Sequence, residues 1–415
     1  MATPLDHVDT IGEKIIDYCK ELVRIPTVNP PGVGYEKMSD YLAKTLRGLN
    51  CEVELVRVPQ SREDELYPFG KGNPRISVIG RYKNSRRERA GLHLSGHYDT
   101  VPPGKGWSKD PFTPLLEGGK IYGLGISDMK GGIASVLGVI RALADLNLQL
   151  RADLTFSFTP DEETGGFAGV GYLVEQKLVK ADFGIITEPA QPHSVKVGHR
   201  GALWVEVTTH GKTAHGSVPY RGVNAFQKIV DIAQGLRELE ERLYQKRTRF
   251  PVIDEAQLSP PVMVGGVVQG GVKTNVVPDE CMVTIDRRLI IEESIAEAYQ
   301  EIEEAIERVK QADPQLRVDL KKTLTIEPSY VPQDHQICSA VAAAHEQVYG
   351  QRPSLVISPG FADAHYFTRG LRIPTITYGP GILGQAHAPD EHIYPEDLVK
   401  AAKVLLQTTL DLVGS

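Results

Sequence analysis

The sequence contains no apolar run of about 18 residues, which a transmembrane helix would need. Its first residues also lack a basic segment followed by an apolar one, so we expect a first helix there and no signal peptide. A net charge of −7 provides no basic excess, and we therefore expect neither nucleic acid nor a membrane as a partner.

Cysteine is scarce as well. The four cysteines stand far apart with no CxxC spacing: Cys19, Cys51, Cys281 and Cys338. Such spacing suggests neither a disulfide framework nor a thiolate metal site. We therefore expect the protein to be in the cytoplasm, which is a reducing compartment.

The 415 residues are enough for two or three domains at about 150 residues each. Helical and strand-like stretches alternate from about residue 10 to 200 and again after about 318, which indicates an α/β domain. Between them lie half-buried alternating strands and an amphipathic helix at 294–312. We predict a discontinuous α/β domain with a mixed sheet, residues 1–199 and 316–415, and an inserted α+β domain, residues 200–315.

Three acidic residues, Asp161, Glu162 and Glu163, follow a predicted strand in the segment TPDEETGG. No basic residue lies within this segment to relieve their repulsion. Either water screens them at the tip of a loop, or a cation lies among them.

Further candidate ligands follow neighbouring predicted strands. In LHLSGHYDTVP, His97 and Asp99 are two residues apart, so the carboxylate can orient an imidazole that binds a metal. His93 lies deeper in the same strand, where a hydrogen-bonded core histidine is expected. Asp128 precedes a predicted helix and is either its N-cap or a ligand. Glu188 ends a fourth strand.

Ligands of open α/β sheets bind at the carboxyl edge of the strands, so we expect these acids and His97 to share one crevice. A buried cluster of carboxylates and imidazole requires positive charge. Mixed histidine and carboxylate ligands without thiolate suit zinc, with cobalt or manganese as alternatives. The glycines at 131 and 132 indicate that the backbone approaches another group closely there.

The motifs quoted above occur together with LVRIPTVNPPG, GLGISDMKGG, ITEP, GKTAHGSVPYRGVNA, TNVVPDE and GQAHAPDEHI. This set resembles the M20 metallopeptidase family, which includes acetylornithine deacetylases, succinyl-diaminopimelate desuccinylases and related carboxypeptidases. The resemblance spans about residues 22 to 395. It implies a hydrolase with two divalent metal ions and an inserted ferredoxin-like domain that serves as a lid and forms a homodimer.

The resemblance also implies roles for individual residues. His97 and Glu188 would bind one metal, Glu163 and His387 would bind the other, and Asp128 would bridge the two. By chemistry alone His392 is as good a candidate as His387, and the match to AHAPDE selects His387. Glu162 would be the general base and Asp99 the partner that orients His97. Asp161 receives no role beyond that of a turn residue.

In the inserted domain, the resemblance implies that His215 reaches the active site of a neighbouring subunit and stabilises an oxyanion. Arg200 and Asn275 resemble residues that hold a substrate carboxylate, and Arg287 is a further candidate beside Arg288. The late segment SPGFADAHYF departs from the family pattern, because His365 stands where many relatives carry an arginine. We include His365 as a substrate-binding candidate, but it is a weaker anion partner than arginine.

The expected function is hydrolysis of the amide bond of an N-acyl amino acid, as in the deacetylases and desuccinylases. A carboxypeptidase or dipeptidase would use the same machinery on a peptide bond. Phe361 and His365 leave open a substrate with a more apolar or aromatic group, including an unusual aryl C–N bond. A catalytically silent binding protein is the alternative from another class, and the presence of every expected ligand argues against it.

Overall fold

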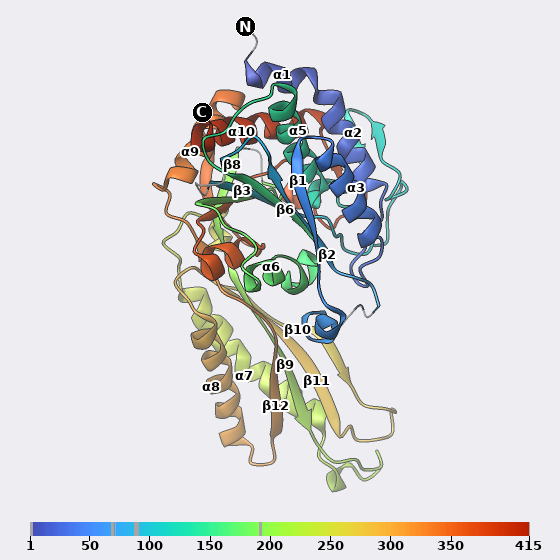
Figure 1. Ribbon diagram of the computed structural model, residues 1–415. Coiled ribbons are helices and arrows are strands. Elements are labelled where there is room, and N and C mark those ends of the chain that lie inside the picture. The colour runs from blue at the N-terminus through green and yellow to red at the C-terminus, as the bar shows by residue number, and fades with distance from the viewer. Residues whose placement is uncertain (1–2, 68–69, 71, 87–90, 191–192, 415) are drawn as a thin grey trace. The chain divides into compact units, whose positions relative to one another are not determined.

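The computed structural model describes residues 3–67, 70, 72–86, 91–190 and 193–414 (Figure 1). The chain divides into two compact units, which are described separately below. The first unit comprises Met1–Gly198, Tyr330–Val356 and Ala362–Ser415, and the second comprises His199–Ser329 and Ile357–Phe361. None of the helices in the described ranges is long and apolar enough to span a membrane.

The first unit is built around a nine-stranded mixed sheet. Its order is β1 (Cys51–Arg57), β2 (Ile76–Tyr82), β6 (Leu154–Thr159), β3 (Leu92–His97), β7 (Phe183–Ile186), β15 (Thr375–Thr377), β8 (Ser194–His199) and β13 (Ser329–Tyr330), with β14 (Ser354–Ser358) paired to β8. The run β6–β3–β7–β15 is parallel, whereas β1–β2, β2–β6 and β15–β8 are antiparallel. The predicted α/β class with a mixed sheet is confirmed.

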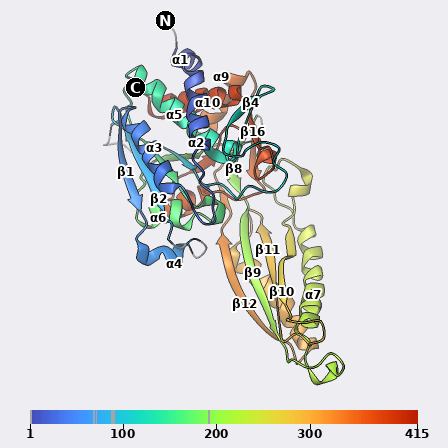
Figure 2. The same ribbon diagram turned by 90° about the vertical axis from the view of Figure 1, so that its right-hand side faces the viewer.

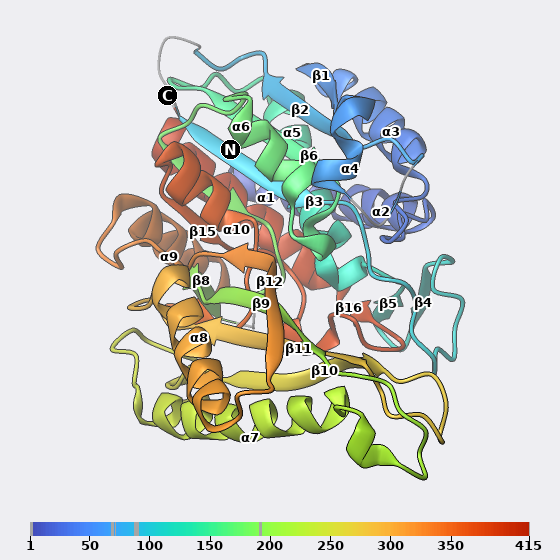
Figure 3. The same cartoon turned by 90° about the horizontal axis from the view of Figure 1, so that it is seen from below.

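Helices cover both faces of this sheet. The helices of the first unit are α1 (Pro4–Thr10), α2 (Gly12–Val23), α3 (Tyr35–Arg47), α4 (Glu63–Leu66), α5 (Gly131–Asp145), α6 (Tyr172–Glu175), α9 (Gln336–Tyr349) and α10 (Pro395–Val413). Helix α5 packs against α2 and α10 on one face, and α6 lies on the other (Figure 1). The small residue Gly138 permits this packing, because a Cβ there would lie 2.7 Å from a carbon of Ile15. A separate three-stranded sheet contains β4 (Leu115–Glu117), β5 (Lys120–Tyr122) and β16 (His392–Ile393) (Figure 3).

The second unit contains a four-stranded antiparallel sheet with two helices. Its elements follow the order β9 (Gly201–His210), α7 (Ala225–Gln245), β10 (Val262–Gly270), β11 (Glu280–Leu289), α8 (Ile295–Ala312) and β12 (Arg317–Ile326). The strand order is β10–β11–β9–β12 (Figure 2). This β-α-β-β-α-β succession gives the sheet one face for the apolar sides of α7 and α8. A capping box of Ser294 and Glu297 begins α8.

The second unit extends beyond the predicted boundary at residue 315. Strand β12 pairs with β9 along almost its whole length, and this pairing draws the chain up to Ser329 into the unit. Local patterning could not reveal this, because the partner strand lies about a hundred residues earlier in the chain.

Arg287 occupies a buried position in this unit. Its guanidinium lies 2.6 Å from Glu293 and 3.2 Å from Glu301, and its side chain is 0% exposed. Arg287 also donates to the carbonyl of Arg288. The pairing of its charge within the unit argues against the predicted role of Arg287 in binding a substrate carboxylate.

We expect Arg287→Leu to lower the free energy of unfolding of the second unit by about 2–3 kcal/mol, because buried Glu293 would lose this partner and keep only the partly exposed Lys246. The matched control is Arg288→Leu, which removes a partly exposed pair with Asp286 and should cost about 1 kcal/mol or less. Urea unfolding followed by fluorescence measures both changes. Unchanged stability combined with a raised KM would return Arg287 to the substrate-binding residues.

Candidate metal centre

The candidate ligands His97, Glu163 and Glu188 and the candidate base Glu162 lie at one edge of the main sheet. His97 is the last residue of β3 and pairs with Thr159, the last residue of β6. Glu162 and Glu163 lie in the loop after β6, and Glu188 lies after β7 on the other side of β3. Because these three strands are parallel neighbours, their carboxyl ends place all four side chains at the same edge.

Asp128 also lies near this edge, but it does not follow a strand of the main sheet. It lies in a short non-helical segment, Ile126–Lys130, with φ −121° and ψ 92°, and α5 begins after it at Gly131. It is therefore neither the N-cap of α5 nor a residue at the end of a main-sheet strand. The close approach expected at the two glycines is found, because a Cβ on Gly132 would lie 2.0 Å from the carbonyl oxygen of Thr187.

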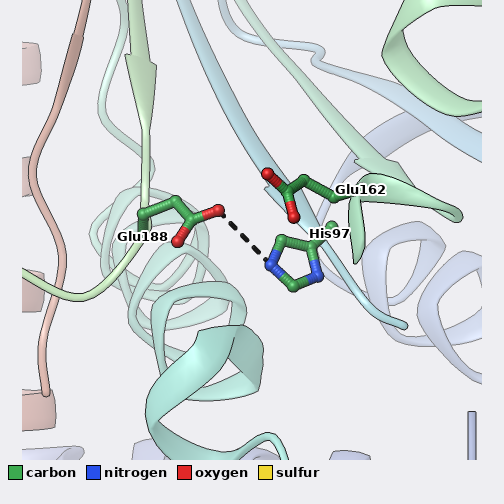
Figure 4. A group of neighbouring side chains, drawn as sticks. All are labelled: His97, Glu162 and Glu188. Carbon is green, nitrogen blue, oxygen red and sulfur yellow. Dashed lines mark ion pairs between the residues drawn. The ribbon is translucent and has the colours of Figure 1, made fainter. Parts of the chain in front are cut away.

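The first group of ligand atoms surrounds His97. Its Nε2 lies 3.2 Å from an Asp128 oxygen and 3.4 Å from a Glu188 oxygen. Figure 4 shows the Glu162 carboxylate facing the same imidazole. Ligand atoms of His97, Glu162 and Glu188 all lie within 4.8 Å of one another. The His97 side chain is 1% exposed, so this position is deep.

The second group surrounds His387. Its Nε2 lies 2.9 Å from Glu163 and 3.7 Å from the other oxygen of Asp128. Asp128 thus turns one oxygen toward each histidine. His387 is 52% exposed, so this position is open. His392 lies elsewhere, on β16, where its ring contacts Tyr122 and its Nδ1 lies 3.0 Å from the carbonyl oxygen of Asp390.

Burial and repulsion between carboxylates raise the pKa values of Glu162 and Glu163. Burial and the nearby Glu188 carboxylate raise the pKa of Glu162 well above its ordinary value. Burial likewise raises the pKa of Glu163 to about 7. A hydrogen bond to Glu163 raises the pKa of His387 to about 9, and hydrogen bonds to carboxylates raise that of His97 although burial opposes the change. These shifts all express one property, namely that the cluster favours added positive charge.

The donor set fits divalent cations. Two imidazoles and several carboxylates converge, and no thiolate is among them. Because Asp128 lies between two histidine–carboxylate pairs, the residues can hold two ions that share one carboxylate.

Asp99 holds His97 and the backbone of Glu162 and Glu163 in position. Its carboxylate lies 3.4 Å from Nδ1 of His97, and its backbone carbonyl oxygen lies 3.1 Å from the same nitrogen. The same carboxylate accepts the backbone amides of Glu162 and Glu163 at 3.2 and 3.3 Å. A single side chain thus connects the β3 ligand with the loop that follows β6. His93 is a core residue, as expected, with its nitrogens at 2.9 Å from Thr155 and Ser157.

Asp161 is more than a turn residue, which corrects the sequence interpretation. It does adopt the left-handed conformation, with φ 67°, but its side chain is 1% exposed and pairs with Arg75 at 2.8 Å. Tyr35 and Asn29 donate to its other oxygen. The basic residue missing from the acidic segment is supplied from a position 86 residues earlier in the chain.

Sequence reasoning also missed Glu391. This buried carboxylate accepts the backbone amides of Gly125, Ser127 and Asp128 at 2.8, 2.7 and 3.1 Å, so it shapes the segment that presents Asp128. Burial raises its pKa to about 8. The only sequence signal was its position within the segment HAPDEH.

The segment that contains His365 packs against the loop after the acidic run. Tyr366 donates to the carbonyl of Gly165 at 2.7 Å. A Cβ on Gly166 would lie 2.2 Å from an oxygen of Asp363, which explains the glycine at this position. The ring centres of His365 and Tyr366 lie 4.0 Å apart with the rings tilted by 36°, and Nδ1 of His365 lies 2.9 Å from the carbonyl oxygen of Ala362.

The remaining candidates lie in the second unit. His215 and Asn275 are neighbours there, because His215 forms a β-bridge with Val276 and the amide of Gly216 donates to the carbonyl of Asn275. Both are exposed, and Nδ1 of His215 lies 2.7 Å from the Ser217 hydroxyl. Arg200 is 5% exposed, and its guanidinium donates to the carbonyls of Gln257 and Ser259.

Known proteins resemble this chain along nearly its whole length. Acetylornithine deacetylase of Photorhabdus laumondii is 30% identical over 403 residues, which cover 94% of this chain and 95% of that protein. N-formyl-4-amino-5-aminomethyl-2-methylpyrimidine deformylase of Halalkalibacterium halodurans is 27% identical, with coverage of 97% and 95%. An M20 family metallo-carboxypeptidase of Sulfolobus solfataricus has the same fold, with a TM-score of 0.77, 20% identity and coverage of 95% and 98%.

These similarities agree with the site. Metal-dependent hydrolysis of amide C–N bonds requires a site that binds divalent ions, and this cluster of histidines and carboxylates suits such ions. Residues 93–411, which contain every candidate ligand, match the sequence pattern of one family. The chain is thus a metal-dependent amide hydrolase, and it belongs to Peptidase family M20/M25/M40.

Proposed function

We propose that this protein hydrolyses the amide bond of an N-acyl amino acid with two divalent metal ions and Glu162 as the general base. One observation carries the proposal: Asp128 lies between two histidine–carboxylate pairs, His97 with Glu188 and His387 with Glu163. Zinc is the first candidate for both positions, with cobalt or manganese as alternatives, because the donors are nitrogen and oxygen atoms.

When bound, two such ions supply Lewis acidity, which polarises an amide carbonyl and makes water acidic enough to react near neutral pH. Glu162 takes the proton of the attacking water and delivers it to the leaving nitrogen. Its carboxylate faces His97 and Glu188 without being needed for the two ligand pairs (Figure 4). Burial raises the pKa of Glu162, and cations bound beside it would lower this pKa again, so that the carboxylate can accept a proton.

Asp99 holds the base and the ligands in position relative to one another. It orients His97 through Nδ1 and holds the amides of Glu162 and Glu163 on the same carboxylate. Glu162 and Glu163 are adjacent in the chain, but their side chains can then point in different directions. Glu163 pairs with His387, while Glu162 faces His97.

The substrate assignment draws on the relatives. The similarity to an acetylornithine deacetylase supports an N-acyl amino acid. The fold shared with a metallo-carboxypeptidase keeps a carboxypeptidase or dipeptidase as the second candidate. The similarity to a pyrimidine deformylase favours keeping an unusual C–N bond as a third. Exposed Asn275, with Arg200 and His365, would contact the substrate.

We further propose a homodimer formed by the second unit, with His215 acting in the active site of the partner subunit. Strand β10 is an edge strand, and its residues Met263, Val267 and Val268 are 55%, 44% and 56% exposed. An apolar open edge of this kind favours pairing with a second copy. On helix α7, Phe226 is also exposed, at 52%. Because the four cysteines are free and buried, we place the protein in the reducing cytoplasm.

Initial rates on a substrate panel test the proposed reaction. With zinc- or cobalt-loaded protein we expect N-acyl amino acids such as N-acetylornithine to exceed dipeptides, N-formyl aryl amines and N-succinyl-diaminopimelate. Glu162→Gln should lower kcat by roughly 100- to 10,000-fold while the metal content stays the same. A dominant dipeptide rate would instead assign a peptidase, and full activity in Glu162→Gln would remove Glu162 from the mechanism.

Metal content tests the ligand assignment, and the sequence offers a matched pair of histidines. His387→Ala should bind one zinc ion per chain tightly instead of two, because Glu163 loses its imidazole partner. His392→Ala should retain both ions, since His392 lies on β16. Elemental analysis after equilibrium dialysis measures both. The reverse pattern would show that the wrong histidine was chosen.

Subunit mixing tests the role of His215. Inactive His215→Ala and Glu162→Gln proteins, exchanged by mild denaturation and refolding, should together regain about a quarter of wild-type activity. Half of the dimers would be mixed, and each would contain one complete site. Sedimentation confirms the dimer, and differently tagged subunits confirm the exchange. No recovery despite verified exchange would show that His215 does not act across the interface.

A further inference from the structure

Arg75, which immediately precedes β2, is a buried cation that neutralises Asp161 in the acidic segment. Its side chain is 1% exposed, and all three nitrogens have partners. Nε donates to Asp161 at 2.8 Å, one terminal nitrogen to the carbonyls of Gly70 and Asn73 at 3.2 and 2.5 Å, and the other to that of Pro31 at 3.1 Å.

The surroundings of Arg75 are shaped for a planar guanidinium. Its central carbon lies 3.2 Å from the ring centre of Tyr67. A Cβ on Gly32 would approach the guanidinium to 2.9 Å, and one on Gly70 would approach it to 2.7 Å. A lysine ammonium has neither the flat surface nor the number of donors to replace these contacts.

Arg75 fixes Asp161 in a conformation that non-glycine residues rarely adopt. Asp161 has φ 67°, and its two oxygens are held by Arg75 on one side and by Tyr35 and Asn29 on the other. The carbonyl of Asp161 accepts the amides of Thr164 and Gly166, so the turn after it depends on this conformation.

The same network continues to the metal ligands. The amide of Asn29 donates to Asp161 at 3.2 Å and to Asp99 at 2.9 Å. Asp99 in turn accepts the amides of Glu162 and Glu163, which directly follow Asp161. The turn that carries base and ligand is thus held at its start by Arg75 and along its backbone by Asp99.

We propose that Arg75 is a positioning residue that sets the directions of the Glu162 and Glu163 carboxylates through Asp161. The proposal rests on the proposed metal centre and goes beyond it, because Arg75 itself contacts none of the ligands in the interactions described above. Loss of the guanidinium would release Asp161 from its left-handed conformation and turn Glu163 away from His387.

The experiment compares Arg75→Lys and Arg75→Ala with Arg81→Lys. Arg81 is a matched control, since it lies on β2, is largely buried and pairs with Asp153 at 2.6 Å. Each protein is titrated with Co²⁺ without substrate, and binding affinity and the visible absorption spectrum are recorded. Thermal unfolding and the kcat and KM of the full-length enzyme are measured in parallel.

We expect Arg75→Lys to weaken binding of one Co²⁺ ion by roughly 10- to 100-fold and to alter its spectrum, with kcat lowered more than KM is raised. Arg81→Lys should leave both unchanged even if its melting temperature falls equally. In Arg75→Ala, millimolar guanidinium ion should restore the spectrum by filling the vacated space. If Arg75→Ala does not fold, Arg75→Lys decides the question.

Wild-type Co²⁺ affinity and spectrum in Arg75→Lys would overturn the proposal and leave the metal centre intact. Equal changes in Arg75→Lys and Arg81→Lys would also overturn it, because general destabilisation would then explain both. Failure of the wild-type protein to bind two ions would contradict the metal centre itself, and the proposal with it. A wrong substrate assignment affects none of these outcomes, since binding is measured without substrate.

Discussion

Repulsion among buried carboxylates is the constraint on which the rest of this structure depends. Asp128, Glu162, Glu163 and Glu188 meet at the carboxyl edge of three parallel strands, where their side chains are largely buried. Carboxylates in such a place need positive charge and many hydrogen bonds. Divalent ions would supply the positive charge. The backbone that carries these acids must be held in place by the chain itself.

The chain meets this second requirement with three separate devices. Asp99 accepts the amides of the acidic turn, Glu391 accepts the amides of the segment before Asp128, and Arg75 neutralises Asp161. Each device acts on backbone or on a neighbour of a ligand, so the ligand carboxylates remain available. Small residues complete the arrangement where backbones must touch, as at Gly132 against Thr187.

The two units differ in how they use charge. The first unit gathers several carboxylates around His97 and His387 at one edge of its sheet, where they can bind cations. In the second unit, buried Arg287 pairs with Glu293, while polar residues such as His215 and Asn275 are exposed. Local sequence could not distinguish these cases, because a buried structural arginine and a substrate-binding arginine look alike until their partners are known.

The sequence by itself determined the α/β class, the separate α+β segment and the acids that follow strands, since periodicity and strand ends are local properties. His97, Glu162, Glu163 and Glu188 were accessible in this way because their strands prove to be parallel neighbours. His387 was separable from His392 only by family resemblance. Only the tertiary structure decided three features: the partners of Asp161, the placement of Asp128 between the two histidines, and the residue at which the second unit ends. Each of these depends on contacts between residues far apart in the chain, which the folded backbone brings together and local patterns do not record.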